Sequence, residues 1–280
     1  MKVGLILPMG DEPGPGVPTD WAGIAAMAHD AEAGGLDSLW VYDHLPETWE
    51  AWTTLAALAA ATRSVQLGTL VSCTSFRHPG LLAKMAHTVA EISGDRLVLG
   101  LGAGWHEPEY RAFGFPFDHR VDRFAESLEI TATLLREGRA DILGRYYRVR
   151  DAEIQPVRPN GAVPRILVGC SGKPRMLGLV ARYADAWNTA WYGVPSDRFR
   201  SNRAALHSAC EAAGRDPATV ELTVGMAIGP KDTQVAPRVD AVAEALAAWR
   251  DEGAEHVIAY PDPTDGTAVA VLCEAAASLR

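Results

Sequence analysis

The 280-residue sequence predicts a (β/α)8 TIM barrel, in which parallel strands close into an inner ring surrounded by helices. Short apolar runs rich in β-branched residues alternate with amphipathic helical stretches along the whole chain, which is typical of a parallel sheet with helical crossovers. The alternation gives eight strand–helix units, and this number favours a closed barrel over an open, doubly wound sheet. No linker, low-complexity tract or long internal repeat divides the chain, so we expect one barrel domain over residues 1–280.

Each strand is predicted from an apolar run that ends at turn residues or at a helix signal. The predicted strands cover residues 2–7, 37–43, 65–72, 96–102, 165–169, 185–188, 220–226 and 255–260. The predicted helices cover residues 20–34, 51–63, 79–93, 119–138, 173–184, 196–214, 237–253 and 264–279. Local signals mark helix ends: Thr19-Asp20 is an N-cap pattern, Gly34-Gly35 is a stop, and Pro79 opens a helix where no N–H is needed.

Three segments fall outside this repeat. Residues 9–18, rich in proline and glycine, are predicted as a long loop after the first strand. Residues 139–164 form the main insertion, in which residues 145–149 alternate as in a small hairpin. Residues 229–236 are predicted as a short polar loop.

The composition limits the kinds of partner. The formal net charge is -9 at pH 7, so the surface does not favour non-specific binding to nucleic acid or to anionic lipid. No apolar run reaches the ~20 residues of a membrane span, and the apolar start of the chain lacks a signal cleavage site, so we expect a cytosolic protein. The 4 cysteines show no CxxC spacing and the 8 histidines no HExxH motif, so we expect free thiols and no metal.

Unusual residues gather where five of the eight predicted strands end. Since the carboxyl ends of all strands in such a barrel meet at one mouth, we expect a ligand site there. Asp43 and His44 end the second strand, and a carboxylate next to an imidazole suits acid/base chemistry. The alternative is that both side chains lie on a solvated loop.

The segment Gly169-Cys170-Ser171-Gly172 lies between a predicted strand and a predicted helix. Small residues there let backbone N–H groups converge on an anion at the helix N-terminus, and Lys173 and Arg175 add positive charge nearby. We therefore predict a phosphate site, the alternative being a tight turn capped by Ser171.

The run Gly100-Leu101-Gly102-Ala103-Gly104 is not a GxGxxG motif and lacks a suitably placed acidic residue, which disfavours a Rossmann nicotinamide site. We expect these glycines to let a flat ligand approach the backbone, the alternative being a flexible loop. Trp105, Trp187 and Trp191 fall at the predicted mouth and are expected to wall a planar ligand. The positions of the four lysines and the absence of GxSxG disfavour a Schiff-base aldolase and a serine hydrolase.

Several stretches, specific when taken jointly, span most of residues 1–190. They are LDSLWVYDH at 36–44, TR at 62–63 with LGTLV at 67–71, FRHP at 76–79, EISGDRL at 91–97 with GLGAGW at 100–105, AFG at 112–114 and ARYADAWN at 181–188. With them the chain resembles the luciferase-like monooxygenase superfamily, and within it the branch of F420-dependent oxidoreductases.

The resemblance implies that F420, a 5-deazaflavin that moves hydride, binds at the carboxyl ends of the strands. It implies that His44 contacts the cofactor and donates or accepts a proton, while Asp43 orients His44. It also implies a non-prolyl cis peptide in the bulge of the third strand, behind the ring, and a phosphate cradle in the loop 169–172. The expected cofactor contacts are Leu70, Val71, Ser72, Gly102, Gly104, Trp105, Gly169, Cys170, Ser171, Gly172, Lys173 and Trp187.

One position departs from the branch that acts on sugar phosphates. Trp105 stands where that branch has an acidic residue, which disfavours a sugar-phosphate dehydrogenase and favours a more apolar substrate pocket. Glu107 and Glu109 nearby are expected to face solvent or to cap the following helix.

Three functions stay open. The first is an F420-dependent oxidoreductase that transfers hydride between deazaflavin and a small organic substrate. The second is an FMN-dependent two-component monooxygenase on the same barrel, and the third is a non-catalytic protein that binds flavin or deazaflavin. Besides a small-molecule substrate, the partners to consider are a second copy of the chain, forming a homodimer, and a reductase that supplies reduced cofactor.

Overall fold

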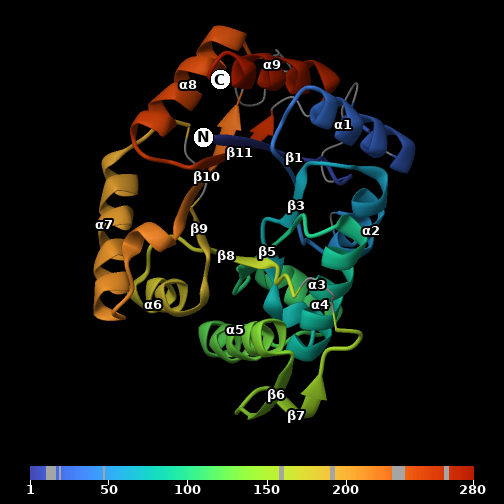
Figure 1. Cartoon of the computed structure of the whole chain (residues 1–280), viewed down its shortest axis with the longest axis vertical. Helices are drawn as coiled ribbons and strands as arrows, with labels where there is room; N and C mark the ends of the chain where they lie inside the picture. The colour runs from blue at the N-terminus through green and yellow to red at the C-terminus, as the bar shows by residue number, and fades with distance from the viewer. Residues whose placement is uncertain are drawn as a thin grey trace.

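The computed structural model describes residues 1–10, 17–18, 20–46, 48–157, 161–189, 193–228, 237–261 and 265–280. Within these residues, eight parallel strands form a closed ring with helices on its outer side (Figure 1), so the predicted TIM barrel is confirmed. The predicted loop at 229–236, Trp191 and most of the predicted loop at 9–18 lie outside the described residues.

The barrel strands follow one another around the ring in chain order and pair in parallel. They are β1 (Lys2–Ile6), β2 (Ser38–Val41), β3 (Gln66–Thr69), β5 (Leu97–Gly102), β8 (Arg165–Gly169), β9 (Ala186–Thr189), β10 (Glu221–Ile228) and β11 (His256–Pro261). The ring closes where β3 pairs with β5, with Leu67 beside Leu97. A short strand β4 (Ser72–Cys73) follows β3 and pairs with β5.

A helix follows each barrel strand, as predicted. These helices are α1 (Trp21–Ala33), α2 (Ala51–Ala61), α3 (Pro79–Ser93), α5 (Arg120–Glu137), α6 (Pro174–Tyr183), α7 (Asp197–Ala212), α8 (Val239–Asp251) and α9 (Gly266–Ala277). Asp20 caps α1 by accepting a hydrogen bond of 2.8 Å from the N–H of Gly23. Of the helices in the described residues, none is both long and apolar enough to cross a bilayer.

The sequence patterns missed the short elements. These are α4 (Glu107–Phe113) and the 3-10 helices η1 (Thr74–Phe76) and η2 (Pro217–Thr219). The small hairpin predicted at 145–149 exists as the antiparallel strands β6 (Arg139–Leu143) and β7 (Arg148–Glu153), but residues 145–147 lie in its turn. The Glu126 carboxylate holds that turn, because it accepts hydrogen bonds from the N–H groups of Arg145, Tyr146 and Tyr147 at 2.8 to 3.1 Å.

The barrel wall separates two apolar cores, because successive strand residues point to opposite faces. The outer core joins strand residues such as Leu39 and Leu99 to the buried faces of the helices. The inner core fills the lumen and contains residues of the strands and strand ends, namely Ile6, Trp40, Leu70, Val98, Leu167, Ala186 and Ile258. Neighbouring residues of one strand therefore have different surroundings, and this alternation also decides which side chains reach the mouth.

A buried polar cluster lies low in the barrel, near the amino ends of the strands. The Trp40 indole N–H donates to Ser38 Oγ at 2.7 Å, and Ser38 Oγ lies 2.7 Å from His256 Nε2. All three side chains are buried. Because Ser38 Oγ accepts from Trp40, its own proton is free to bond His256 Nε2, and the imidazole fits this site in its neutral form.

This burial predicts an acid-sensitive contribution to stability. Burial lowers the pKa of His256 from 6.5 to about 4, although Glu221 and Asp37 favour the charged form, while Lys2 and Arg165 oppose it. Below pH 6.5 the unfolded chain takes up a proton that the folded chain refuses, so we expect stability to fall between pH 7 and pH 4. The loss from this one group is about 3 kcal/mol.

Urea unfolding at several pH values measures this loss, with His256→Gln as the reference, because glutamine keeps a hydrogen bond to Ser38 but does not titrate. We expect the native protein to lose more stability on acidification than the variant. Parallel pH profiles for the two proteins would show that His256 plays no part.

Candidate active site at the mouth of the barrel

The residues predicted for the site come from loops that follow different strands, and the barrel brings most of these loops together. Val71, just after β3, connects three of them. A Cβ added at Gly102 would lie 2.5 Å from Val71 Cγ2, and one added at Gly169 would lie 2.9 Å from Val71 Cγ1. The ends of β3, β5 and β8 thus meet around one side chain.

The peptide bond between Leu70 and Val71 is cis, which confirms the predicted non-prolyl cis peptide. It lies where the chain leaves β3: the N–H of Leu70 still donates to the carbonyl of Val41 on β2 at 2.9 Å. Two residues later, Ser72 pairs with Leu101 on the other neighbouring strand, β5. The bulge therefore moves the chain from one strand neighbour to the other at the rim of the lumen.

The glycines at the end of β5 and just after it make room for protein atoms. An added Cβ at Gly100 would overlap the carbonyl oxygen of Thr69, and one at Gly102 would collide with Val71. At Gly104, where φ is +73°, it would overlap the Tyr110 hydroxyl. The expectation that these missing side chains admit a flat ligand is therefore wrong, since the space is already packed. Contact between a ligand and the backbone of Gly102 and Gly104 stays a prediction.

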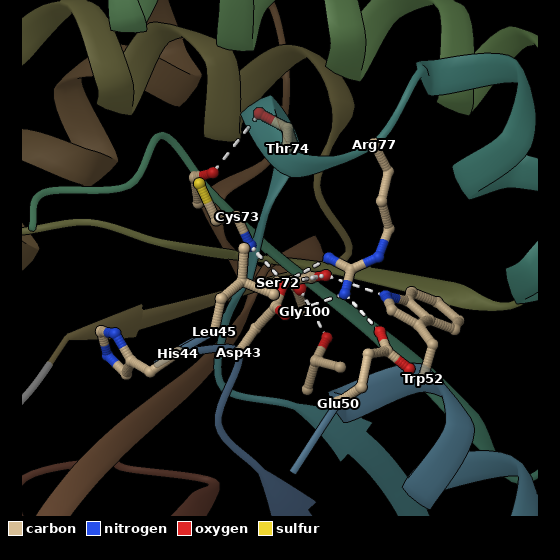
Figure 2. Close-up of polar contacts among 12 residues, drawn as sticks. Asp43, His44, Leu45, Glu50, Trp52, Ser72, Cys73, Thr74, Arg77 and Gly100 are labelled. Carbon is tan, nitrogen blue, oxygen red and sulfur yellow. Dashed lines mark hydrogen bonds and ion pairs between the residues drawn. The ribbon is translucent and has the colours of Figure 1, made fainter. Parts of the chain in front are cut away.

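We expected Asp43 to orient His44. Instead, the Asp43 carboxylate binds Arg77. Its side chain is 1% exposed, and the carboxylate accepts two hydrogen bonds from the Arg77 guanidinium at 2.6 and 2.9 Å. It also accepts from the Ser72 hydroxyl and the Cys73 N–H, both at 2.9 Å. Figure 2 shows the His44 ring apart from this network. The reason is strand alternation: Asp43 continues the outer face of β2, and His44 continues the face of Trp40 and Tyr42, which points into the lumen.

The Asp43 network continues on its outer side. Arg77 also pairs with Glu50, and Ser72 Oγ accepts a hydrogen bond of 3.0 Å from the Trp52 indole N–H. Burial opposes the charge on Arg77, but the bonds to Asp43 and Glu50 outweigh it and raise the pKa of the guanidinium. The hydroxyl of Ser72 is therefore committed to Asp43 and Trp52, and the network fixes the chain just after the cis peptide.

His44 pairs with Glu109, a residue whose role the sequence reading missed. His44 Nδ1 lies 3.3 Å from Glu109 Oε2, which also accepts a hydrogen bond of 3.3 Å from the Leu45 N–H. Glu109 is 2% exposed, so the expectation that it faces solvent or caps the helix is wrong, whereas Glu107 is exposed and pairs with Arg111. Residues two apart on a helix point to nearly opposite sides. Once a helix is assigned there, the spacing of Glu107 and Glu109 indicates that only one of them faces solvent.

Aromatic rings surround His44 at the mouth. The centroid of its imidazole lies 5.8 Å from that of Trp105, and 6.3 Å from those of His106 and Tyr42. Tyr42 in turn lies 6.1 Å from Tyr260, centroid to centroid; Tyr42 follows β2 and Tyr260 lies on β11, and both strands pair with β1. Trp105 is 70% exposed, so its indole is open to a planar ligand, and its role as a wall of the site stays a prediction.

The loop that carries Trp105 is anchored from below. The Tyr110 hydroxyl donates to the Ala103 carbonyl at 3.0 Å and lies 2.9 Å from Cys73 Sγ. Arg120 donates to the Gly104 carbonyl at 2.6 Å. Burial raises the pKa of the Cys73 thiol to about 11, so this cysteine stays protonated and serves packing.

The predicted phosphate loop runs from β8 into α6, which begins at Pro174. Ser171 and Lys173 are exposed, and Gly172 has φ +87°. Arg175, expected to add charge, instead pairs with Asp122. Pro174 opens α6 without an N–H, so the features here that fit an anionic group are the dipole of α6 and the exposed residues Ser171 and Lys173 before it.

Trp187 was expected to wall the ligand, and its position contradicts this. The side chain is 0% exposed and belongs to the outer core, because Trp187 lies between the inward-facing residues Ala186 and Asn188. Its indole N–H lies 3.1 Å from the carbonyl oxygen and 3.2 Å from Sγ of Cys170. Trp187 therefore packs behind the loop for which a phosphate site was predicted and holds it at Cys170.

The family model of luciferase-like monooxygenases matches residues 1–270 of the chain. The chain belongs to this family. It is 32% identical over 201 residues to the pyrimidine monooxygenase RutA of Agrobacterium fabrum, covering 69% of this chain and 53% of that protein. It is 31% identical over 211 residues to the F420-dependent hydroxymycolic acid dehydrogenase of Mycobacterium tuberculosis, covering 70% of this chain and 56% of that one. The chain thus spans only about half the length of these two relatives.

A solved structure of an F420-dependent secondary alcohol dehydrogenase, in complex with an F420-acetone adduct, has the same fold as this luciferase-like chain. The TM-score is 0.80 at 16% identity, and the match covers 100% of this chain and 99% of the other. The relatives at 31–32% identity thus include both a monooxygenase and an F420-dependent dehydrogenase. In the part of the chain that is described, no three or more His, Cys, Asp or Glu side chains gather closely enough to hold a metal ion.

The substitution Asp43→Asn breaks the buried ion pair with Arg77, and we expect the free energy of unfolding to fall by about 3–5 kcal/mol. Urea unfolding followed by tryptophan fluorescence measures the loss. Asp240→Asn, which breaks an exposed pair with Arg238, is the matched control and should show no measurable change. Equal midpoints for the two variants would contradict a structural role for the Asp43 network.

In Gly102→Ala the new methyl group collides with Val71, and we expect the free energy of unfolding to fall by about 1–3 kcal/mol. A second change, Val71→Ala, should recover part of this loss, because it removes the colliding group. Gly178→Ala is the control, since nothing lies within 4 Å of a Cβ there and the substitution should not destabilise α6. Additive effects of the Gly102 and Val71 changes would rule out the collision.

Proposed function

We propose that the protein is an F420-dependent oxidoreductase that transfers hydride between deazaflavin and a small organic substrate. The position of His44 carries the proposal: its imidazole stands at the mouth, a quarter exposed, beside the exposed indole of Trp105. When the carbon of a carbonyl or alcohol gains or loses a hydride, the attached oxygen gains or loses a proton. An imidazole is suited to donate or accept that proton. The F420-dependent relative and the F420-bound neighbour support the choice of cofactor.

The residues at the mouth suit a flat ring with an anionic tail. Leu70, Val71 and the backbone of Ser72 would lie behind the ring, with Gly102, Gly104 and Trp105 beside it. The amide groups around Ser171, with Lys173 and the dipole of α6, would hold the tail. When bound, the cofactor would supply or accept the hydride.

His44 would act on the oxygen of the substrate. In the oxidation of an alcohol it takes the hydroxyl proton as the carbonyl forms, and in the reduction of a carbonyl it returns that proton. Trp105, Tyr42 and Tyr260 offer mainly apolar surface around the site, which favours an apolar substrate over a sugar phosphate.

A second candidate is an FMN-dependent monooxygenase supplied with reduced cofactor by a separate reductase. The observation that favours it is the 32% identity to a pyrimidine monooxygenase. A non-catalytic flavin or deazaflavin carrier is the third candidate. We further propose that the protein is cytosolic and forms a homodimer.

Titration with F420 and with FMN, followed by quenching of tryptophan fluorescence, tests the cofactor. We expect F420 to bind at micromolar concentration and FMN to bind more weakly, and tight binding of FMN alone would favour the monooxygenase.

Catalysis is tested with His44→Gln and a panel of secondary alcohols and ketones, following the absorbance of the deazaflavin. We expect turnover to fall by about 10²–10⁴-fold, because the proton donor is lost, while F420 affinity changes little. His207→Gln, an exposed histidine on α7, is the matched control. Unchanged turnover in His44→Gln would leave the imidazole without a catalytic role.

A further inference from the structure

We infer that Glu109 is a positioning residue that fixes the tautomer of His44, so that Nε2 is the nitrogen that exchanges a proton with the substrate. The inference rests on the proposed function for its catalytic consequence. The contact itself, between Nδ1 of the imidazole and Oε2 of the carboxylate at 3.3 Å, does not depend on it.

The chemistry of the two groups sets the direction of the hydrogen bond. An ionised carboxylate only accepts hydrogen bonds, whereas a neutral imidazole has one N–H and one bare nitrogen. The nitrogen that faces Glu109 must therefore carry the proton. Nε2 is left with a lone pair, so it can take a proton from a hydroxyl group without any rearrangement of the ring.

Glu109 is held firmly enough for this role. Its neighbour Tyr110 anchors α4 through the Ala103 carbonyl and packs against Phe76 with ring centroids 5.1 Å apart. The Leu45 N–H donates to the same oxygen of Glu109 that faces His44, so the carboxylate is tied to the residue that follows the imidazole. A group built on a packed helix is placed more accurately than one on a free loop.

The other nearby carboxylates do not compete for His44. Asp43 is saturated by Arg77, Ser72 and Cys73, and Glu107 is exposed and pairs with Arg111. His106 lies 6.3 Å from His44 between ring centroids, and no hydrogen bond joins these two described residues. Of the carboxylates of Asp43, Glu107 and Glu109, that of Glu109 is thus the one that contacts the His44 imidazole.

The same contact serves both protonation states during a reaction. In the oxidation of an alcohol, bound deazaflavin would accept the hydride from the carbon, and Nε2 would take the proton from the oxygen as the carbonyl bond forms. The imidazole then carries a positive charge, and its Nδ1–H still faces the negative carboxylate, which stabilises the cation. In the reverse direction Nε2 returns the proton to the alkoxide oxygen.

The tautomer can be measured directly in the full chain without cofactor. Two-bond ¹H–¹⁵N spectra of protein labelled at histidine distinguish the protonated ring nitrogen, and His44→Gln assigns the signal. We expect native His44 in the Nδ1–H form. In Glu109→Gln the amide can donate as well as accept, so we expect a shift toward the Nε2–H form. Glu107→Gln, on the same helix, should leave the signal unchanged.

Turnover gives the second readout. We expect kcat of Glu109→Gln to fall by about 10²-fold with KM and F420 affinity within about threefold, since the contact acts through His44 and not on the ligands. Glu109→Asp keeps a carboxylate and should keep the Nδ1–H form with an intermediate kcat.

Several outcomes would overturn the role of Glu109. A native His44 in the Nε2–H form, or an unchanged tautomer in Glu109→Gln, would do so, as would an equal loss of kcat in Glu107→Gln. If Glu109→Gln fails to fold, the spectra of the native protein and of Glu109→Asp still decide the tautomer. Failure to bind F420 would refute the proposed function while leaving the tautomer result in place, so the two failures are distinguishable.

Discussion

The register of β2 determines the chemistry of the mouth. Trp40 fills the lumen where β1 and β3 have glycine, and a Cβ at Gly68 would overlap its ring. This fit fixes which face of β2 points inward, because a shift of one residue would turn every side chain to the other side. With the register set, Asp43 must point outward and His44 toward the mouth. Asp43 thus stabilises the chain around the site, whereas His44, the next residue, lies at its opening.

The frame is a set of contacts that converge on the bulge after β3. From the outer side, Asp43 and Arg77 hold Ser72 and Cys73. From the mouth side, Val71 fills the space left by Gly102 and Gly169 and so joins the ends of three strands. A buried charge pair of this kind adds little net stability but makes alternative arrangements costly. The rim of the lumen is therefore rigid where a flat ligand would rest.

A small number of side chains held by this frame lie at the opening of the barrel. His44 and the exposed indole of Trp105 face the opening, while Glu109 reaches the imidazole from α4. The chain belongs to the luciferase-like family, and its relatives include an F420-dependent dehydrogenase and a monooxygenase. An imidazole backed by a carboxylate suits the first chemistry, because hydride transfer at a carbon–oxygen bond is coupled to the movement of one proton.

The sequence by itself determined the eight strand–helix units, the family and the placement of His44 at a strand end, because these follow from local periodicity, caps and motifs. Tertiary structure decided the partners. Asp43 and Arg77 are 34 residues apart and His44 and Glu109 are 65 apart, so no local pattern links them. The same holds for Trp187. The sequence predicted it at the mouth, but strand alternation points its side chain into the outer core. Periodicity shows that a strand has two faces, and only the closed barrel determines which of them is the inside.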